Sequence, residues 1–160
     1  MPRFFYTVLS CILMIACDNQ ERNRADSSST DDSTLHTFLD AYYKTMSNRD
    51  WSKYRECFWE NATISASWQK EGDSAVNVHV ITIDDFIEAT PAGPDSKPIF
   101  SEKMRSASVD IKGNLASAWV DYDVEFGTHD SLMKWSGTDV FTFLKNNGEW
   151  RIASLVFESN

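Results

Sequence analysis

Hydrophobic positions in the first third of the chain repeat with the period of a helix. Between residues 33 and 47, apolar side chains recur three and four residues apart, at Leu35, Phe38, Leu39, Tyr42, Tyr43 and Met46. Side chains with this spacing share one face of a helix, so the pattern predicts an amphipathic helix capped by Ser33 or Thr34. A second, shorter helix is predicted after Asp50, with apolar positions at Trp51, Tyr54 and Phe58.

Beyond residue 60, apolar and polar positions mostly alternate with the period of a β-strand. Strands are predicted over residues 61–68, 76–83, 104–111, 115–126, 134–144 and 150–157. A short helix around Phe86, capped by Asp84, is predicted between the second and third strands. It has to end before Pro91, because proline cannot continue a helix at that position.

Glycine and asparagine stand at hairpin spacing between the later strands. Gly113-Asn114 and Asn146-Asn147-Gly148 supply the residues that tight turns favour, so they predict an antiparallel meander. Helices followed by a run of antiparallel strands indicate an α+β domain. We therefore expect N-terminal helices packed on one face of a strongly curved antiparallel or mixed sheet.

The N-terminus MPRFFYTVLSCILMIAC has the parts of a targeting signal. Arg3 precedes an apolar run, Phe4 to Ile15, and Ala16 is a small residue at the junction with Cys17. The run is short for a transmembrane helix. Its end resembles the bacterial lipoprotein signal, in which the cysteine becomes the lipidated first residue. The alternative is an ordinary secreted protein that has a cysteine at this position.

The lipoprotein interpretation divides the chain into three parts. Residues 1–16 form the signal peptide, residues 17–32 hold the lipidated Cys17 and a flexible polar tether, and residues 33–160 form the folded domain. The expected location is the bacterial cell envelope, with the acylated Cys17 in the membrane. Cys57 is then the one remaining thiol, and we expect it to be a buried, unreactive residue.

The charge balance limits the partners. The chain carries 15 basic and 24 acidic residues, a formal net charge of −9. Nucleic acid is therefore not an expected partner, because phosphate binding needs clustered Lys and Arg. An anionic membrane surface would also repel the chain, which leaves the lipid as its membrane anchor.

Four segments resemble one superfamily. They are FLDAYYKTMSNRDWSKYRECFWENATI, ITIDDFIEA, VDIKGNLASAWVDYDVEF and GTDVFTFLKNNGEWRIASLVFE. The first is similar to the opening helix pair and first strand of the nuclear transport factor 2-like, or SnoaL-like, fold. The second resembles its short third helix, and the last two resemble the final strands of its lumazine-binding-like branch. The resemblance spans residues 33 to 158 and implies a cone-shaped, cystatin-like domain with an apolar pocket between sheet and first helix.

The stretch GTDVFTFL places a carboxyl group among core residues. By strand alternation, Asp139 points to the same side as Phe141 and Phe143. The strand resembles that of steroid isomerases of this superfamily, whose aspartate donates a hydrogen bond to a substrate oxygen. By the same resemblance, Tyr42 corresponds to the tyrosine that shares this role. The alternative is that Asp139 bonds a backbone N–H or a tyrosine and only holds its strand in place.

The third part of an isomerase site is missing. The position that matches the base is Ala66, which cannot abstract a proton, so we assign no catalytic residue. Asp139, Tyr42 and His79 remain candidates, with His79 as the replacement base of an isomerase, dehydratase or cyclase. We expect instead a pocket that binds a small apolar molecule without catalysis. Its predicted lining is Tyr42, Trp59, Trp68, Trp135, Asp139 and Phe141.

Cofactor and metal motifs are absent from the sequence. It contains no Gly-rich phosphate loop, nucleophile elbow or HExxH motif, and no two histidines stand at metal-ligand spacing. We therefore expect neither a cofactor nor a metal. Asp121, Asp123 and Glu125 share one strand face, which we interpret as a solvated outer face. Trp119 lies on the same face and is a candidate contact for a homodimer. A structural dimerisation or partner-binding module is accordingly a further alternative.

Overall fold

The computed structural model describes residues 29–68 and 77–159, except the side chain of Trp68. The signal peptide, Cys17 and most of the predicted tether lie outside these residues. The chain divides into two compact units, Met1–Thr34 and Leu35–Asn160, and the fold described below is that of the second unit. None of the described helices is long and apolar enough to cross a membrane.

The helices form where the sequence predicts them, with shifted ends. Residues 29–47 are helical, so the helical segment includes four residues of the predicted tether. Helix α2 (Trp51–Glu56) is capped by Asp50, whose side chain accepts a hydrogen bond from the Lys53 backbone N–H. Helix α3 (Ile83–Ala89) is capped by Thr82.

The cap of α3 corrects the predicted one. Asp84 lies in the first turn, and Thr82 forms a reciprocal capping box with Asp85. The helix ends at Ala89, and two 3₁₀ turns follow, η1 (Thr90–Ala92) and η2 (Pro94–Ser96). Each turn has a proline near its start, where the missing N–H costs nothing.

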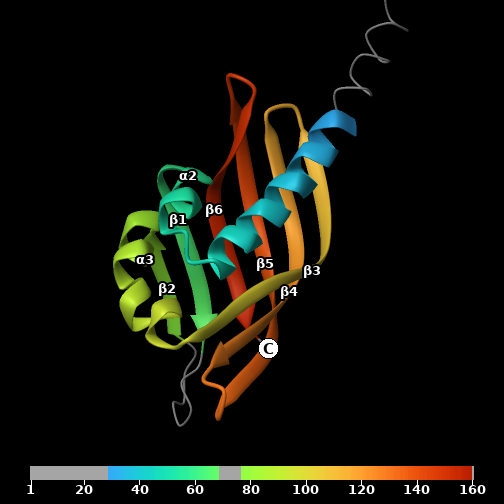
Figure 1. Ribbon diagram of the computed structural model, residues 1–160. Coiled ribbons are helices and arrows are strands. Elements are labelled where there is room, and N and C mark those ends of the chain that lie inside the picture. The colour runs from blue at the N-terminus through green and yellow to red at the C-terminus, as the bar shows by residue number, and fades with distance from the viewer. Residues whose placement is uncertain (1–28, 69–76, 160) are drawn as a thin grey trace, which may run out of the picture. The chain divides into compact units, whose positions relative to one another are not determined.

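The strands form one six-stranded sheet of order β2-β1-β6-β5-β4-β3 (Figure 1). All neighbouring pairs are antiparallel except β1 and β6, which are parallel, so the sheet is mixed and contains the predicted meander β3 to β6. The strands are β1 (Phe58–Trp68), β2 (Asn77–Thr82), β3 (Ile99–Lys112), β4 (Leu115–Gly127), β5 (Leu132–Asn146) and β6 (Glu149–Ser159).

Strand β3 begins five residues before its predicted start at Met104. Its early residues pair with the end of β4, with Ile99 opposite Gly127 and Glu102 opposite Val124. Backbone hydrogen bonding rather than side-chain alternation extends β3. The long strand β4 has N–H and C=O groups that need partners, and the early residues of β3 supply them. This extension brings Glu102 into the sheet.

The core lies between the inner face of the sheet and the helices. Figure 1 shows the helix of residues 35–47 crossing this face, with α2 and α3 near β1 and β2. Phe38 packs edge-on against Phe143, with ring centroids 5.6 Å apart, and Tyr42 packs in the same way against Phe141 at 5.1 Å. The predicted α+β architecture, with helices on one face of a curved sheet, is confirmed.

Candidate functional site

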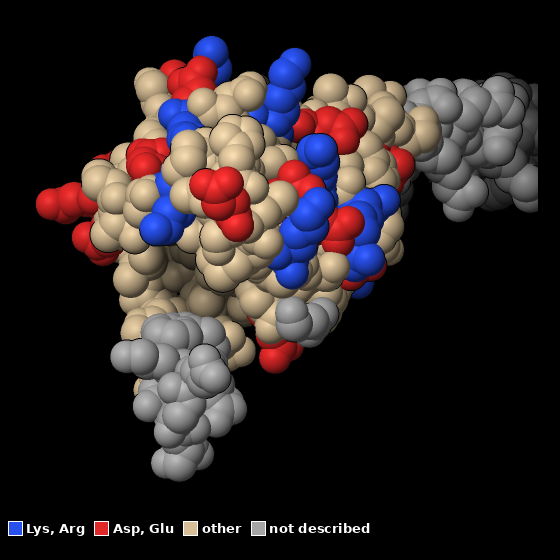
Figure 2. All heavy atoms as spheres, turned by 60° about the horizontal axis from the view of Figure 1, so that its bottom comes forward, with Lys and Arg blue, Asp and Glu red and all other residues tan. Residues whose placement is uncertain are grey.

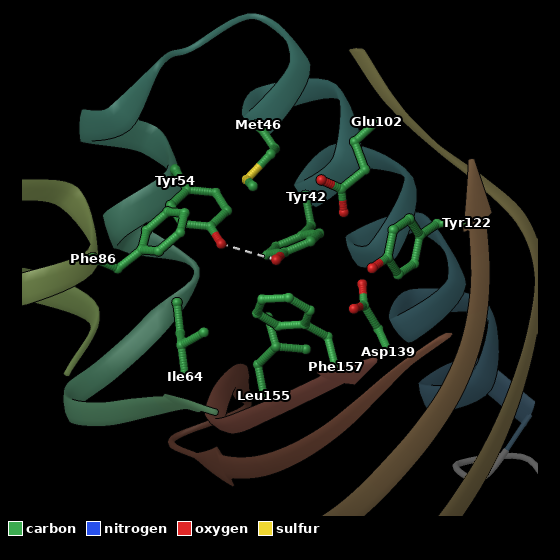
Figure 3. A pocket seen from close by; sticks show the side chains of 10 residues that line it. All are labelled: Tyr42, Met46, Tyr54, Ile64, Phe86, Glu102, Tyr122, Asp139, Leu155 and Phe157. Carbon is green, nitrogen blue, oxygen red and sulfur yellow. Dashed lines mark hydrogen bonds between the residues drawn. The ribbon is translucent and has the colours of Figure 1, made fainter. Parts of the chain in front are cut away.

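A small cavity lies inside the unit, between the helices and the inner face of the sheet (Figure 3). Its volume is about 60 Å³. A cavity of this volume holds a few water molecules. Within the part of the chain that the structure describes, its lining is aromatic and apolar apart from two carboxyl groups and three phenol hydroxyls. The lining residues are Tyr42, Met46, Tyr54, Ile64, Phe86, Glu102, Tyr122, Asp139, Leu155 and Phe157.

Asp139 is the buried acid at the floor of this inner cavity. The residue is only 2% exposed, and it lies on the inner side of β5 as the strand alternation predicts. Oδ2 accepts a hydrogen bond from the hydroxyl of Tyr43, which comes from the first helix. Burial raises the pKa of Asp139 to about 7, although the bond from Tyr43 opposes the rise. The carboxyl group is therefore protonated more readily than that of an ordinary aspartate.

Glu102 supplies the second carboxyl group, from β3. Its backbone is held by the helix, because the hydroxyl of Ser47 donates to Glu102 O at 2.7 Å and accepts from Glu102 N–H at 2.8 Å. The side chain reaches into the inner cavity, where Figure 3 shows its carboxyl group, that of Asp139 and the hydroxyl of Tyr122 facing one another. Burial, and then the nearby charge of Asp139, raise the pKa of Glu102 well above its ordinary value.

Tyrosines surround the two acids. Tyr42 and Tyr54 share a hydrogen bond between their hydroxyls at 2.9 Å, and burial raises the pKa of both phenols. Tyr122 lies over Gly137 on the neighbouring strand, where an added Cβ would stand 2.3 Å from the tyrosine hydroxyl. Gly137 thus leaves the space that lets the Tyr122 ring enter the site.

An apolar groove adjoins the inner cavity. This outer groove has a volume of about 310 Å³ and shares Ile64, Phe86 and Phe157 with the inner cavity. Figure 2 looks onto this end of the unit and shows a hollow, and the described side chains at its border are mainly uncharged. Among the described residues, its lining is Ile64, Ala66, Ser67, His79, Ile81, Phe86, Phe157 and Ser159. Together the two spaces form a site with an apolar entrance and an acidic inner end.

The structure separates the predicted site residues into two groups. Tyr42 and Asp139 both line the inner cavity, but the bond to Asp139 comes from Tyr43, and the Tyr42 hydroxyl is paired with Tyr54. Phe141 is fully buried behind the site and touches neither space. His79 and Ala66 line the outer groove.

The predicted tryptophans do not line the described site. Trp59 donates its ring N–H to Leu144 O at 3.0 Å, and the guanidinium of Arg151 stacks over its ring. Trp135 packs edge-on against Phe126 at the far part of β5. The side chain of Trp68 lies outside the described residues. Indole rings can pack against the sheet in several places. Residue type alone therefore does not predict which tryptophans line the pocket.

Two site residues escaped the sequence-based reasoning. Tyr43 lies on the same apolar helix face as Tyr42. This shared face was a signal that either phenol could reach Asp139. Glu102 gave no signal, because it stands before the predicted start of its strand.

The acidic residues of β4 lie on the outer face of the sheet, as expected. Asp121 accepts hydrogen bonds from Ser106 and Thr138, and Glu125 pairs with Lys134. No group of acids, histidines and cysteines among the described residues has the arrangement of a metal site.

The same outer face carries a row of apolar residues across the strands. The register places Val80, Val156, Val140 and Trp119 on successive strands, with Ser65 of β1 between the first two. Trp119 is 61% exposed and Val80 63%. The homodimer contact at Trp119 stays a prediction, now with a defined surface.

Cys57 is a free, half-buried cysteine. Burial raises the pKa of its thiol to about 11, so the thiolate is scarce at neutral pH. This agrees with an unreactive residue.

The comparisons with known proteins define the class. The model of the Putative lumazine-binding family matches residues 30–158. The chain belongs to this family, which places it in the nuclear transport factor 2-like superfamily. No curated protein matches the sequence.

Solved structures share the fold, and three of them illustrate the likeness. A protein of unknown function from Mycobacterium tuberculosis superposes with a TM-score of 0.68 at 17% identity, over 85% of this chain and 75% of that one. The β subunit of a putative aromatic-ring-hydroxylating dioxygenase from Novosphingobium aromaticivorans gives 0.68 at 14%, over 84% and 92%. A putative dehydratase of the nuclear transport factor 2-like family from Streptomyces avermitilis gives 0.65 at 12%, over 83% and 98%. At such identities the likeness establishes the fold alone.

Proposed function

We propose that the protein is a lipid-anchored domain of the bacterial cell envelope that binds a small, largely apolar molecule without turning it over. The observation that carries the proposal is that the apolar outer groove lies against the acidic inner cavity and shares Ile64, Phe86 and Phe157 with it. The inner cavity is too small for a whole ligand. The body of the molecule would therefore lie in the outer groove, with one polar group at the inner end.

Tyr42 keeps its role in this proposal, but as part of a network. Its hydroxyl is held by Tyr54, and Tyr43 holds Asp139, so the helix positions both polar groups at the inner end. A preorganised set of polar contacts orients a ligand at low entropic cost.

We expect the full-length protein, purified in mild detergent, to retain a small molecule in native mass spectrometry. Asp139→Ala and Tyr42→Phe should lose the adduct, because each removes a polar group of the inner cavity. Asp123→Ala, which removes an exposed acid from the outer face, should retain it. Solvent extraction would then give the compound class. An adduct that persists in both site variants would place the ligand elsewhere, and no adduct in any sample would favour a structural module.

The anchor has its own test. Cys17→Ser should move the protein from the membrane fraction to the soluble fraction and remove the mass of the acyl chains. The reason is that stable attachment needs more than one buried chain. A membrane-bound Cys17→Ser protein would refute the anchor without touching the ligand site.

The second candidate is an enzyme of the isomerase, dehydratase or cyclase type. The pKa of Asp139 near 7 favours it, because a group with such a pKa both gives and takes protons at neutral pH. The replacement base His79, however, lines the outer groove, whereas Asp139 lines the inner cavity. We therefore favour binding, and a co-purified compound would be the first substrate to test for turnover.

A further inference from the structure

The inner cavity contains acids without a basic partner. Its lining includes Glu102 and Asp139 but no lysine, arginine or histidine among the described residues. The phenols of Tyr42, Tyr43, Tyr54 and Tyr122 lie around the two carboxyls and carry no charge at neutral pH. Away from the cavity, Glu102 also borders a more open groove with Asp40, Lys44 and Lys103. Buried carboxylates are costly unless a cation or hydrogen bonds compensate them.

Hydrogen bonding within the described residues leaves this compensation incomplete. Asp139 accepts one bond, from Tyr43 to Oδ2, and no described residue donates to its Oδ1, which keeps slight solvent access although the residue is only 2% exposed. The carboxyl group of Glu102, which is a half-buried residue, also has no hydrogen-bond donor among the described residues; only its backbone is bonded, to Ser47. Both groups point into the cavity (Figure 3). The free oxygens therefore lie where a ligand atom would be.

The remaining walls have the chemistry of a cation site. Aromatic rings of Tyr42, Tyr54, Tyr122, Phe86 and Phe157 border the cavity. The faces of such rings attract an ammonium group, and the attraction grows when water is excluded. The formal net charge of −9 also raises the local concentration of cations and disfavours anions.

We propose that the ligand is a hydrophobic amine, whose ammonium group lies in the inner cavity between Glu102 and Asp139 and whose apolar body occupies the outer groove. This inference rests on the proposed binding function and names its ligand class. A terminal ammonium with its attached methylene group matches a space of about 60 Å³. An ammonium offers three donors, enough for the open oxygens of both acids.

The inference predicts how affinity depends on pH. Asp139 changes protonation near pH 7, and an ammonium binds its ionised form. Affinity for an amine should therefore rise between about pH 6 and about pH 8, while the ligand itself stays protonated. A neutral ligand that accepts a hydrogen bond from a protonated acid should show the opposite trend.

The test compares three probes of one carbon skeleton: phenethylamine, phenethyl alcohol and phenylacetate. Each is measured by equilibrium dialysis against the full-length protein in phosphatidylcholine nanodiscs, with empty nanodiscs as the blank. We expect the amine to bind at least about tenfold more tightly than the alcohol at about pH 8, since only the amine pairs with the buried charge. Phenylacetate should bind least.

The variants assign the effect to the two acids. Glu102→Gln and Asp139→Asn should each remove most of the preference for the amine, while Asp123→Asn on the outer face should leave it unchanged. Circular dichroism checks that each variant is folded. If one acid variant does not fold, the other one alone is enough to test the inference.

The outcomes separate this inference from the proposed function. An alcohol that binds as tightly as the amine would overturn the amine class and leave apolar binding intact. A preference for the amine that survives both acid variants would also overturn it. Absence of binding by all three probes would refute the inference, whereas the proposed function would still be judged by the co-purified compound.

Discussion

Replacing Asp139 with asparagine is expected to raise the free energy of unfolding at about pH 8 by a few kcal/mol. The folded-state pKa of about 7 lies above the ordinary value of an aspartate, so the folded protein binds this proton more tightly than the unfolded chain does. The stability that this proton supplies is complete below about pH 4, and it is lost as the pH rises to about 7. Asparagine has no charge to bury, and its amide oxygen can still accept the bond from Tyr43.

Urea denaturation between about pH 4 and about pH 8 measures this effect through the midpoint and slope of each curve. The wild-type protein should lose stability as the pH rises, and Asp139→Asn should flatten the dependence. Glu102 also has a raised pKa, so the double variant with Glu102→Gln should be flatter still. Asp123→Asn is the control, and its effect should stay within about 0.5 kcal/mol because the side chain is exposed.

The opposite result would also be informative. If Asp139→Asn is less stable than the wild type across the whole pH range, the carboxylate acts as the preferred acceptor of the Tyr43 hydroxyl. Asp139 would then be the strand-fixing acid of the alternative interpretation, and the case for a ligand site would weaken.

Phe141→Ala is expected to lower the free energy of unfolding by about 3–5 kcal/mol, the usual cost of deleting a buried phenylalanine. Phe141 is fully buried, and its ring contacts those of Tyr42, at 5.1 Å between centroids, and Phe143, at 5.8 Å. The cavity left behind would lie between the helix and the sheet, where neither backbone can collapse easily.

Phe157→Ala is the matched control for this prediction. Phe157 is half-buried and lines both spaces of the site, so its loss should cost less stability and reduce ligand binding instead. Thermal or urea unfolding measures the first effect, and the mass-spectrometric adduct measures the second. The contrary result would be a Phe141→Ala variant that is as stable as the wild type but no longer retains the ligand. Phe141 would then line the pocket, as the sequence analysis predicts.

Local periodicity explains how much of the fold the sequence predicted. The apolar positions from Leu35 to Met46 specify one helix face, and the alternation through Asp139, Phe141 and Phe143 specifies one side of a strand. Both are properties of neighbouring residues, and the structure confirms both. The turn residues at Gly113 and Gly148 adopt positive φ angles, and they fix the hairpins in the same local way.

The site was only partly predictable, because alternation says which side a residue faces but not what lies opposite. Asp139 was correctly placed on the buried side, yet its partner is Tyr43, 96 residues away, rather than Tyr42. Trp59 and Trp135 were expected in the pocket because they are large and aromatic. They instead pack on other parts of the sheet, because an indole ring can be buried favourably at many positions.

The sequence by itself determined the α+β class, the order of the elements and the buried position of Asp139. Only the tertiary structure decided that Glu102 joins Asp139 at the inner end of an apolar groove. The physical reason is that Glu102 enters the sheet through backbone pairing of β3 with β4 and through the hydroxyl of Ser47, neither of which leaves a pattern in the side chains around it. The raised pKa values of the two acids arise in turn from burial, and the residues that bury them come from distant segments of the chain.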